Sequence, residues 1–200
     1  MASRLLAGVI VAAAVVPMVA QPRLTRQDAD RFQVKLITIV AQGNARPAAK
    51  AAAPRTTVIS DAEVNSYLRF HAASQIPVGV VDPLINAIGD GRVSGSATVD
   101  LDAVRKQKQR GWTDPMGYLA GKLPLTAVGR LTTKDGIGRF ELESAELSGV
   151  TVPKTLLQEL LAYYSRTPEN PAGIDMDAPF ELPSAIREIK VARGNATVVQ

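Results

Sequence analysis

The chain has 200 residues, with 23 basic and 19 acidic side chains, a net charge of +4, one histidine and no cysteine. A charge this small, spread along the chain, lacks the basic surface that nucleic-acid binding requires, so we exclude a nucleic-acid partner. One histidine without cysteine cannot build a transition-metal site, and we expect neither a metal nor a cofactor. Burial of apolar side chains, without disulfides, must hold the fold, and a chain of this length can bury enough of them.

Residues 1–20 have the pattern of a secretory signal peptide: Arg4, an apolar run, Pro17 and a final Ala20. The apolar segment is interrupted by Pro17 and falls short of the roughly 20 residues that a membrane-spanning helix needs. Met18 is larger than the residue usual three positions before the end of a signal peptide, but Ala20 is still the best cleavage site. We expect an exported protein, periplasmic or extracellular, that keeps 22 basic and 19 acidic side chains, a charge of +3, once Arg4 is removed.

Residues 21–56 are expected to form a helix followed by a linker. Thr25 with Asp28 resembles a capping box, and the residues Phe32, Leu36, Ile37 and Val40 recur at helical spacing. The β-branched run LITIV leaves a strand possible from residue 35 onward. The stretch GNARPAAKAAAPRT, rich in alanine and proline, is typical of a flexible linker. A single compact domain is therefore expected over residues 57–200.

The stretch VISDAEVNSYL opens this domain with a predicted helix. Ser60 and Glu63 form the S-x-x-E capping box, which gives Glu63 a role in helix initiation and not in catalysis. Asn65 lies off the predicted apolar stripe, where it could hydrogen-bond a neighbouring loop. His71 continues the stripe and is expected to pack rather than to bind a ligand. The predicted buried stripe consists of Val64, Tyr67 and Leu68.

After residue 90 the apolar period changes from 3.6 to 2. In GRVSGSATVDLDAVR, alternate residues from Val93 through Leu101 to Ala103 are apolar or small, which predicts a strand with one wet face. LPLTAVGRLTT repeats this pattern, KDG predicts a turn, and IGRFELESAELSG, residues 137–149, predicts a third strand. Together these segments predict an antiparallel meander.

A second helix is predicted in VTVPKTLLQELLAYYS, with Pro153 in its first turn and leucines at helical spacing. IREIKVARGNATVVQ then predicts two strands joined by a turn near Gly194 and Asn195. The expected fold class is α+β, a curved antiparallel β-sheet meander with two helices packed on one face, plus the N-terminal helix.

The sheet face predicted to lie inward carries unusually small side chains. Gly95, Ala97, Ala103, Ala127 and Gly129 all belong to it. Either a helix packs closely over these residues, or the glycines mark bends, or sheet and helix enclose an apolar groove for a lipid-like ligand. The candidate ligand-binding residues are Ala97, Val99, Ala127, Gly129, Leu156, Leu157, Leu160, Leu161 and Tyr164.

A leucine-rich helix laid in a curved antiparallel sheet, in a secreted chain, resembles a single lobe of the TULIP-type lipid-binding proteins. GVTVPKTLLQELL and FELPSAIREIKVARGNATVV are similar to the closing helix and hairpin of the small bacterial relatives of that family. The resemblance covers residues 57–200 and rests on element order, so no family residue is carried over by position. It implies binding or transfer of a hydrophobic molecule in the cell envelope.

Common catalytic motifs are missing from the sequence. A hydrolase triad needs a histidine base, for which only His71 is available, and GRVSG has its serine one place too late for G-x-S-x-G. GDGRVSG lacks the lysine and spacing of a phosphate-binding loop. Glu141 and Glu143 share one strand face about 7 Å apart, which fits either a glycosidase pair or a solvated surface. We expect no enzyme.

Two pairs of aspartates, Asp100 with Asp102 and Asp175 with Asp177, could hold calcium but lack the twelve-residue loop that makes such a site specific. The long segment RTPENPAGIDMDAPFELP, residues 166–183, is a candidate lid because loops of this length are commonly functional or mobile.

Residues 105–121 carry cations followed by aromatic side chains, a composition that suits an anionic membrane surface. The alternative is a solvated charge run that closes onto a tryptophan at the end of the core. The candidate membrane-contact residues are Arg105, Lys106, Lys108, Arg110 and Trp112.

These patterns favour an exported soluble protein that binds a hydrophobic or lipid-like ligand in the cell envelope. The alternative is a structural or protein-interaction module of the envelope without a small-molecule ligand.

Overall fold

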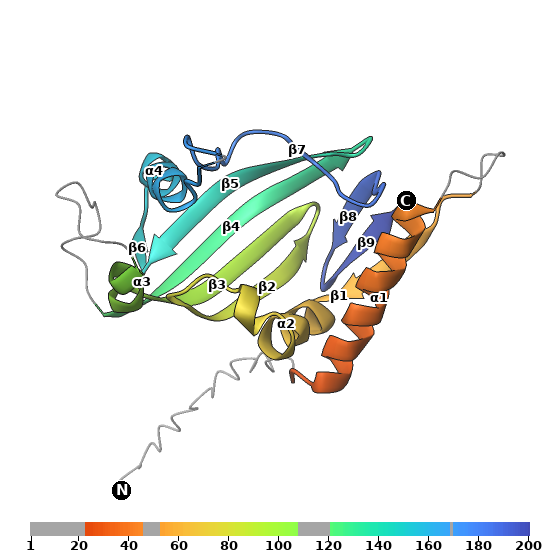
Figure 1. Ribbon diagram of the computed structural model, residues 1–200, viewed down its shortest axis with the longest axis horizontal. Helices are drawn as coiled ribbons and strands as arrows, with labels where there is room; N and C mark the ends of the chain where they lie inside the picture. The colour runs from red at the N-terminus through yellow and green to blue at the C-terminus, as the bar shows by residue number, and fades with distance from the viewer. Residues whose placement is uncertain (1–22, 46–52, 108–120, 169) are drawn as a thin grey trace, which may run out of the picture.

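The computed structural model describes residues 23–45, 53–107, 121–168 and 170–200, which form four α-helices and two antiparallel sheets (Figure 1). The α+β class, the meander and the N-terminal helix predicted from the sequence are confirmed. The helices are α1 (Arg26–Asn44), α2 (Asp61–Phe70), α3 (Leu101–Gln107) and α4 (Lys154–Tyr164), with a short 3-10 helix, η1 (Ala73–Gln75), after α2. No helix of the described ranges is long and apolar enough to cross a membrane.

The larger sheet has six strands, of which five form a meander. Its strands are β2 (Val80–Gly89), β3 (Arg92–Asp100), β4 (Lys122–Lys134), β5 (Ile137–Leu147) and β6 (Val150–Thr151) in that order, with β7 (Phe180–Glu181) paired to β5. Three of the hairpins turn on two residues that both have positive φ, which are Asp90-Gly91, Asp135-Gly136 and Ser148-Gly149. Such turns match the twist of the flanking strands, so neighbours in sequence become neighbours in the sheet.

The smaller sheet has three strands, β1 (Thr56–Ser60), β9 (Asn195–Val199) and β8 (Glu188–Ala192), in the order β1-β9-β8. The C-terminal hairpin predicted from the sequence is confirmed, with Ala192 paired to Asn195 across the turn. β1 was not predicted. Its five residues pair with β9 from the far end of the chain, a contact that no local pattern announces.

Buried apolar packing concentrates around the smaller sheet. Figure 1 shows α1 lying along this sheet, with α2 beside it. The core cluster consists of Ile39, Ile59, Ile186 and Val198, surrounded by Phe32, Val64, Leu182 and Ile189. A Cβ built on Gly43 would lie 2.2 Å from the carbonyl oxygen of Ser184, so the helix approaches this turn too closely for any side chain.

Helix α1 begins where predicted, since the Thr25 side chain accepts from the amide of Asp28. It continues as a helix to Asn44, so the alternative strand from Lys35 is wrong. α1 packs against α2 and β1. His71 Nε2 lies 2.7 Å from Asp30 Oδ1 of α1, and the His71 ring stands edge-on to Tyr67.

Helix α2 begins with the predicted capping box: the Glu63 amide donates to Ser60 Oγ at 3.3 Å and the Ser60 amide donates to Glu63 Oε2 at 2.8 Å. The predicted buried stripe is confirmed only in part: Val64 packs against the core cluster and Tyr67 contacts Phe32, but Val64, Tyr67 and Leu68 are half-buried. The buried side chains of α2 are Glu63, Asn65 and Ser66. Each of them hydrogen-bonds a neighbouring element: Ser66 accepts from the Thr25 amide, Glu63 from Lys35, and Asn65 donates to the Ile85 carbonyl.

Strand β3 ends earlier than predicted. Asp100 Oδ1 accepts from the amide of Ala103 at 2.9 Å and begins α3, so the strand alternation through Leu101 and Ala103 is wrong. Leu101 is buried as a helical residue. β2 was also not predicted, because Pro83 and the positive φ of Asp82 interrupt its pattern.

Candidate functional site

The predicted strand positions of the groove lie together on one face of the larger sheet. β3 and β4 pair without a register shift, with Gly95 opposite Ala127 and Val93 opposite Gly129. The same face continues onto β2, where Ile85 pairs with Gly95, and onto β5, where Ala145 pairs with Ala127. We call it the apolar sheet face; its members are Ile85, Ala87, Val93, Gly95, Ala97, Val99, Leu123, Leu125, Ala127, Gly129, Leu131, Phe140, Leu142, Ala145 and Leu147.

This face is incompletely covered by the described residues. No residue of β3 is buried, although every second one is apolar or glycine. Gly129 and Ala145 are buried, but Ile85 keeps 43% of its surface exposed. Over Gly95 the nearest atom of the described residues that a Cβ would meet is the Leu84 carbonyl oxygen at 4.0 Å, so these residues leave the space above this glycine open. Covering an apolar surface that is in contact with water by an apolar molecule is favourable, because both surfaces are removed from water.

Gly129 is the exception, because the protein fills this position itself. A Cβ on Gly129 would lie 2.3 Å from Phe140 Cζ, so the aromatic ring of β5 occupies the place of a side chain on β4. Phe180 of β7 covers Gly138 in the same way, 2.5 Å from a Cβ at that position. At Gly129, close packing across strands explains the small residue without a ligand.

The leucine-rich helix α4 contacts β5, the strand next to the one that carries Ala127. Figure 1 shows α4 beside β5 and β6, at one end of the larger sheet. Leu156 is 40% exposed, and Leu157 and Leu161 are half-buried. The side chains of Leu160 and Tyr164 lie outside what the structure describes.

The segment predicted as a lid is hydrogen-bonded to α4. Gln158 donates to the carbonyl of Ile174 at 3.0 Å and accepts from the amide of Met176 at 2.7 Å. Asp177 pairs with Lys154 at 2.5 Å, so its carboxylate is used to hold this segment on the helix.

Glu143, one of the two glutamates predicted to share a strand face, pairs with two arginines. Glu143 accepts from Arg92 Nε at 2.7 Å and lies 3.4 Å from Arg130, on a strand whose register shifts at this point. This arrangement corresponds to the solvated-surface alternative for the Glu141 and Glu143 pair. In the described ranges, no group of three or more His, Cys, Asp or Glu side chains is placed to hold a metal ion.

The outer edge of β2 is paired by side chains of α2, an arrangement that sequence reasoning missed. Asn65 Nδ2 donates to the Ile85 carbonyl at 2.8 Å, and the Ile85 amide donates to Asn65 Oδ1 at 2.7 Å. The Ala87 amide donates to both carboxylate oxygens of Asp61 at 3.1 Å. We call these two side chains the edge clasp. They fix β2 beside α2 in place of a further strand.

The pKa values of the two acids at the start of α2 are shifted in opposite directions. Burial raises the pKa of Asp61, and the hydrogen bond from Ala87 opposes this only in part. Burial also acts to raise the pKa of Glu63, but Lys35 at 2.7 Å and the hydrogen bonds from Ser60 overcome it, so the pKa of Glu63 is lowered. Glu63 therefore joins α1 to α2 as an ionised group.

The predicted membrane-contact residues fall largely outside the described ranges. Lys106 lies exposed on α3, whereas the Arg105 side chain and Lys108, Arg110 and Trp112 are not described. No protein-family model matches the chain, and no curated protein or solved structure matches it.

Proposed function

We propose that the protein binds a hydrophobic or lipid-like ligand in the cell envelope, and that the apolar sheet face forms the wall of its binding site. One observation carries the proposal: across β3 and β4 this face combines small residues with half-exposed apolar ones, and no residue of β3 is buried. Burying one CH₂ group against such a wall contributes roughly 0.8 kcal/mol, so a chain of ten would contribute about 8 kcal/mol before the costs of binding.

Two further features support the same proposal. Residues 1–20 have the composition of a signal peptide, which would bring the chain to the compartment where lipids are exchanged. The order of helix, meander, helix and hairpin resembles one lobe of TULIP-type proteins, which bind lipids. We propose cleavage after Ala20, and the intact mass of the exported protein tests this, since a mass that retains residues 1–20 contradicts it.

The experiment fills the space over the small residues. Ala97→Leu and Ala127→Leu should lower the uptake of a fluorescent fatty acid while the melting temperature stays unchanged or rises. Thr126→Leu is the matched control, because Thr126 is exposed and its neighbours in β4 carry the apolar face. Destabilisation of both alanine variants by about 1–3 kcal/mol would indicate packed core instead. Together with an organic extract of the wild-type protein that contains no lipid, this would end the proposal.

A protein-interaction module is the second candidate, favoured by an exposed stripe on α1. Val34 and Ile37 are 63% and 60% exposed, and Val40 continues the stripe one turn further along. Apolar side chains grouped on one helix face are typical of contacts with other proteins. If the wild-type protein binds no lipid, we expect it to co-purify with a protein partner from envelope extracts, and Ile37→Ser should reduce the amount of that partner.

A further inference from the structure

A second hollow lies between α2, η1 and β2. It is an open cavity of about 1010 Å³, comparable with the roughly 300–1000 Å³ of small-molecule sites. Its apolar lining includes Leu24, Leu68, Phe70, Ile76, Val78 and Leu84. We call it the α2–β2 cavity.

Along residues 84–87 of β2, the residues that line the α2–β2 cavity alternate with members of the apolar sheet face. Ile85 pairs with Gly95 of the apolar sheet face, whereas Leu84, which lines the cavity, pairs with Ser96. Successive residues of a strand point to opposite faces, so Leu84 and Ile85 belong to different surfaces. A molecule that lies beside Leu84 and Asn86 in the cavity is therefore separated by β2 from Gly95 and Ala127 of the apolar sheet face.

Two arginines stand at the aromatic wall of this cavity. The Cζ atoms of Arg26 and Arg69 lie 5.4 Å and 5.9 Å from the centre of the Phe70 ring, and Arg69 itself lines the cavity. Both side chains are exposed, and among the described residues neither makes an ion pair with an acid. The neighbouring acids of α1 are engaged elsewhere, Asp28 with Arg31 and Asp30 with His71.

The charges around the cavity are unequal. Asp82 is the acid in its lining, and it belongs to the β2 wall. The two guanidinium groups flank Phe70 at the end of α2, where the contact with the ring orients them. Guanidinium groups suit carboxylate and phosphate because their planar donors can form two parallel hydrogen bonds.

We propose that the α2–β2 cavity binds a single-chain amphiphile with an anionic head group. The head group pairs with Arg26 and Arg69, and the apolar tail lies among Leu68, Val78 and Leu84. This inference shares its ligand class with the proposed function, but it places the ligand in the α2–β2 cavity and not on the apolar sheet face. The two can therefore fail separately.

The test compares one probe with and without its charge. Delipidated protein is titrated with cis-parinaric acid and with its methyl ester, and binding is followed by the fluorescence of the polyene. Arg26→Gln with Arg69→Gln should raise the Kd for the acid about tenfold or more, because two charge-assisted contacts are lost. The Kd for the ester should change less than about twofold, because the apolar wall is intact.

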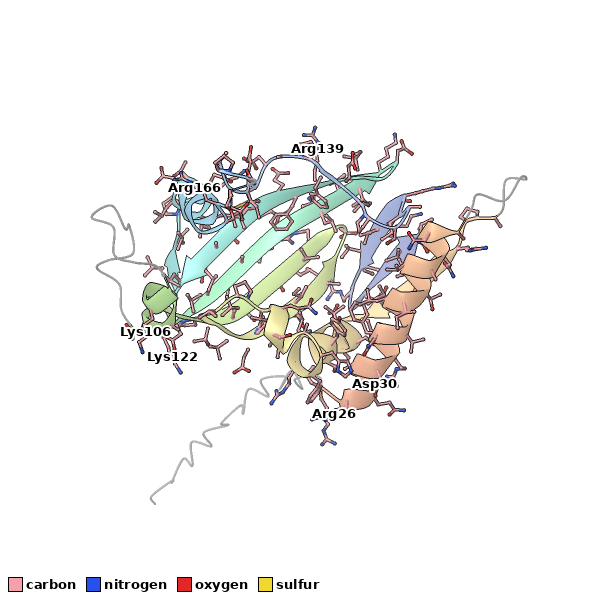
Figure 2. All side chains as sticks on the ribbon, in the orientation of Figure 1. Arg26, Asp30, Lys106, Lys122, Arg139 and Arg166 are labelled. Carbon is pink, nitrogen blue, oxygen red and sulfur yellow. The ribbon has the colours of Figure 1, made fainter. Side chains whose placement is uncertain are left out.

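Two further variants locate the probe. Val78→Trp should weaken acid and ester alike, because Val78 lines the cavity and is exposed enough to accept a larger ring. Arg139→Gln is the control for the loss of a positive charge away from the cavity. Figure 2 shows Arg139 on the far side of the molecule from Arg26. Circular dichroism and melting temperature confirm that each variant is folded.

The outcomes are distinct. Loss of acid affinity in the double arginine variant, without loss in Arg139→Gln or Ala127→Leu, supports the α2–β2 cavity. An acid affinity unchanged in both the double arginine variant and Val78→Trp overturns it. If binding is then lost in Ala127→Leu, the apolar sheet face is the site and the proposed function stands alone. Wild-type protein that binds neither acid nor ester contradicts both proposals.

Discussion

Replacing Asn65 by alanine should destabilise the protein strongly, although its surroundings include no reactive group. Asn65 is 1% exposed and makes two hydrogen bonds, of 2.7 Å and 2.8 Å, to the backbone of Ile85. Two such bonds contribute a net of about 2 kcal/mol, and the cost rises to about 4 kcal/mol if the freed groups of Ile85 stay out of reach of water. We therefore expect Asn65→Ala to lower the free energy of unfolding by about 2–4 kcal/mol.

Urea unfolding followed by circular dichroism measures this difference. Asn86→Ala is the control, because Asn86 lies on β2 next to Ile85, is half-buried, and its side chain has no hydrogen-bond partner in the described ranges; its effect should stay below about 0.5 kcal/mol. Asn65→Asp separates hydrogen bonding from volume. It keeps the size of the side chain but sets a carboxylate against the Ile85 carbonyl, so it should be as damaging at neutral pH and recover when the acid is protonated. A loss below about 0.5 kcal/mol in Asn65→Ala would refute the edge clasp as a source of stability.

Two further predictions concern α1. Lys35 and Ser60 lower the pKa of Glu63 below 4.5 against the effect of burial, so ionised Glu63 stabilises the folded protein above that pH. This stabilisation is lost as the pH falls through the pKa of Glu63 in the folded protein. In Glu63→Gln, unfolding experiments between about pH 3 and pH 7 should therefore no longer show this loss of stability. Asp61, whose pKa is raised, changes stability in the opposite sense, but equally in wild type and variant. If the difference in free energy of unfolding between wild type and Glu63→Gln does not change with pH across this range, Glu63 is not the group responsible. Gly43→Ala should cost about 1–3 kcal/mol, since the new methyl group meets Ser184, whereas Gln33→Ala on the exposed side of α1 should stay within about 0.5 kcal/mol; equal urea midpoints would show that the contact yields freely.

Local signals were sufficient for much of the fold. The capping box of Ser60 and Glu63, the period of two in β3 and β4 and the KDG turn each depend on residues close in sequence, and each gave the right element. The same period placed Ala97, Val99, Ala127 and Gly129 on one face, because alternation fixes the face whatever the pairing. Asp100 was an available signal for α3, but the alternation that continues through Leu101 concealed the helix cap.

The remaining features depend on contacts that no local pattern contains. Phe140 covers Gly129 only because β5 pairs with β4 in a register that shifts beside Val128. β2 carries Pro83 and a residue of positive φ, so its pairing, not its composition, makes it a strand. The α2–β2 cavity needs the start of α1, the end of α2 and β2 in one place. The sequence placed Asn65 off the apolar stripe as a hydrogen-bonding residue, but its partner, the backbone of Ile85, is known only from the pairing of α2 with β2.

The pairing of β1 with β9 has a consequence for the order of folding. Ser60 pairs with Asn195, and the side chain of Gln200 donates to the carbonyls of Ile39 and Ser184 at 2.8 Å and 2.6 Å. Closing the loop between Ser60 and Asn195 costs about 4 kcal/mol of chain entropy, whereas three hairpins of the meander close over two residues each. We infer that the meander forms first and that the two ends of the chain dock last. Until β9 is available for pairing, α1 lacks the partners that bury Ile39, so the core cluster around the smaller sheet is completed last.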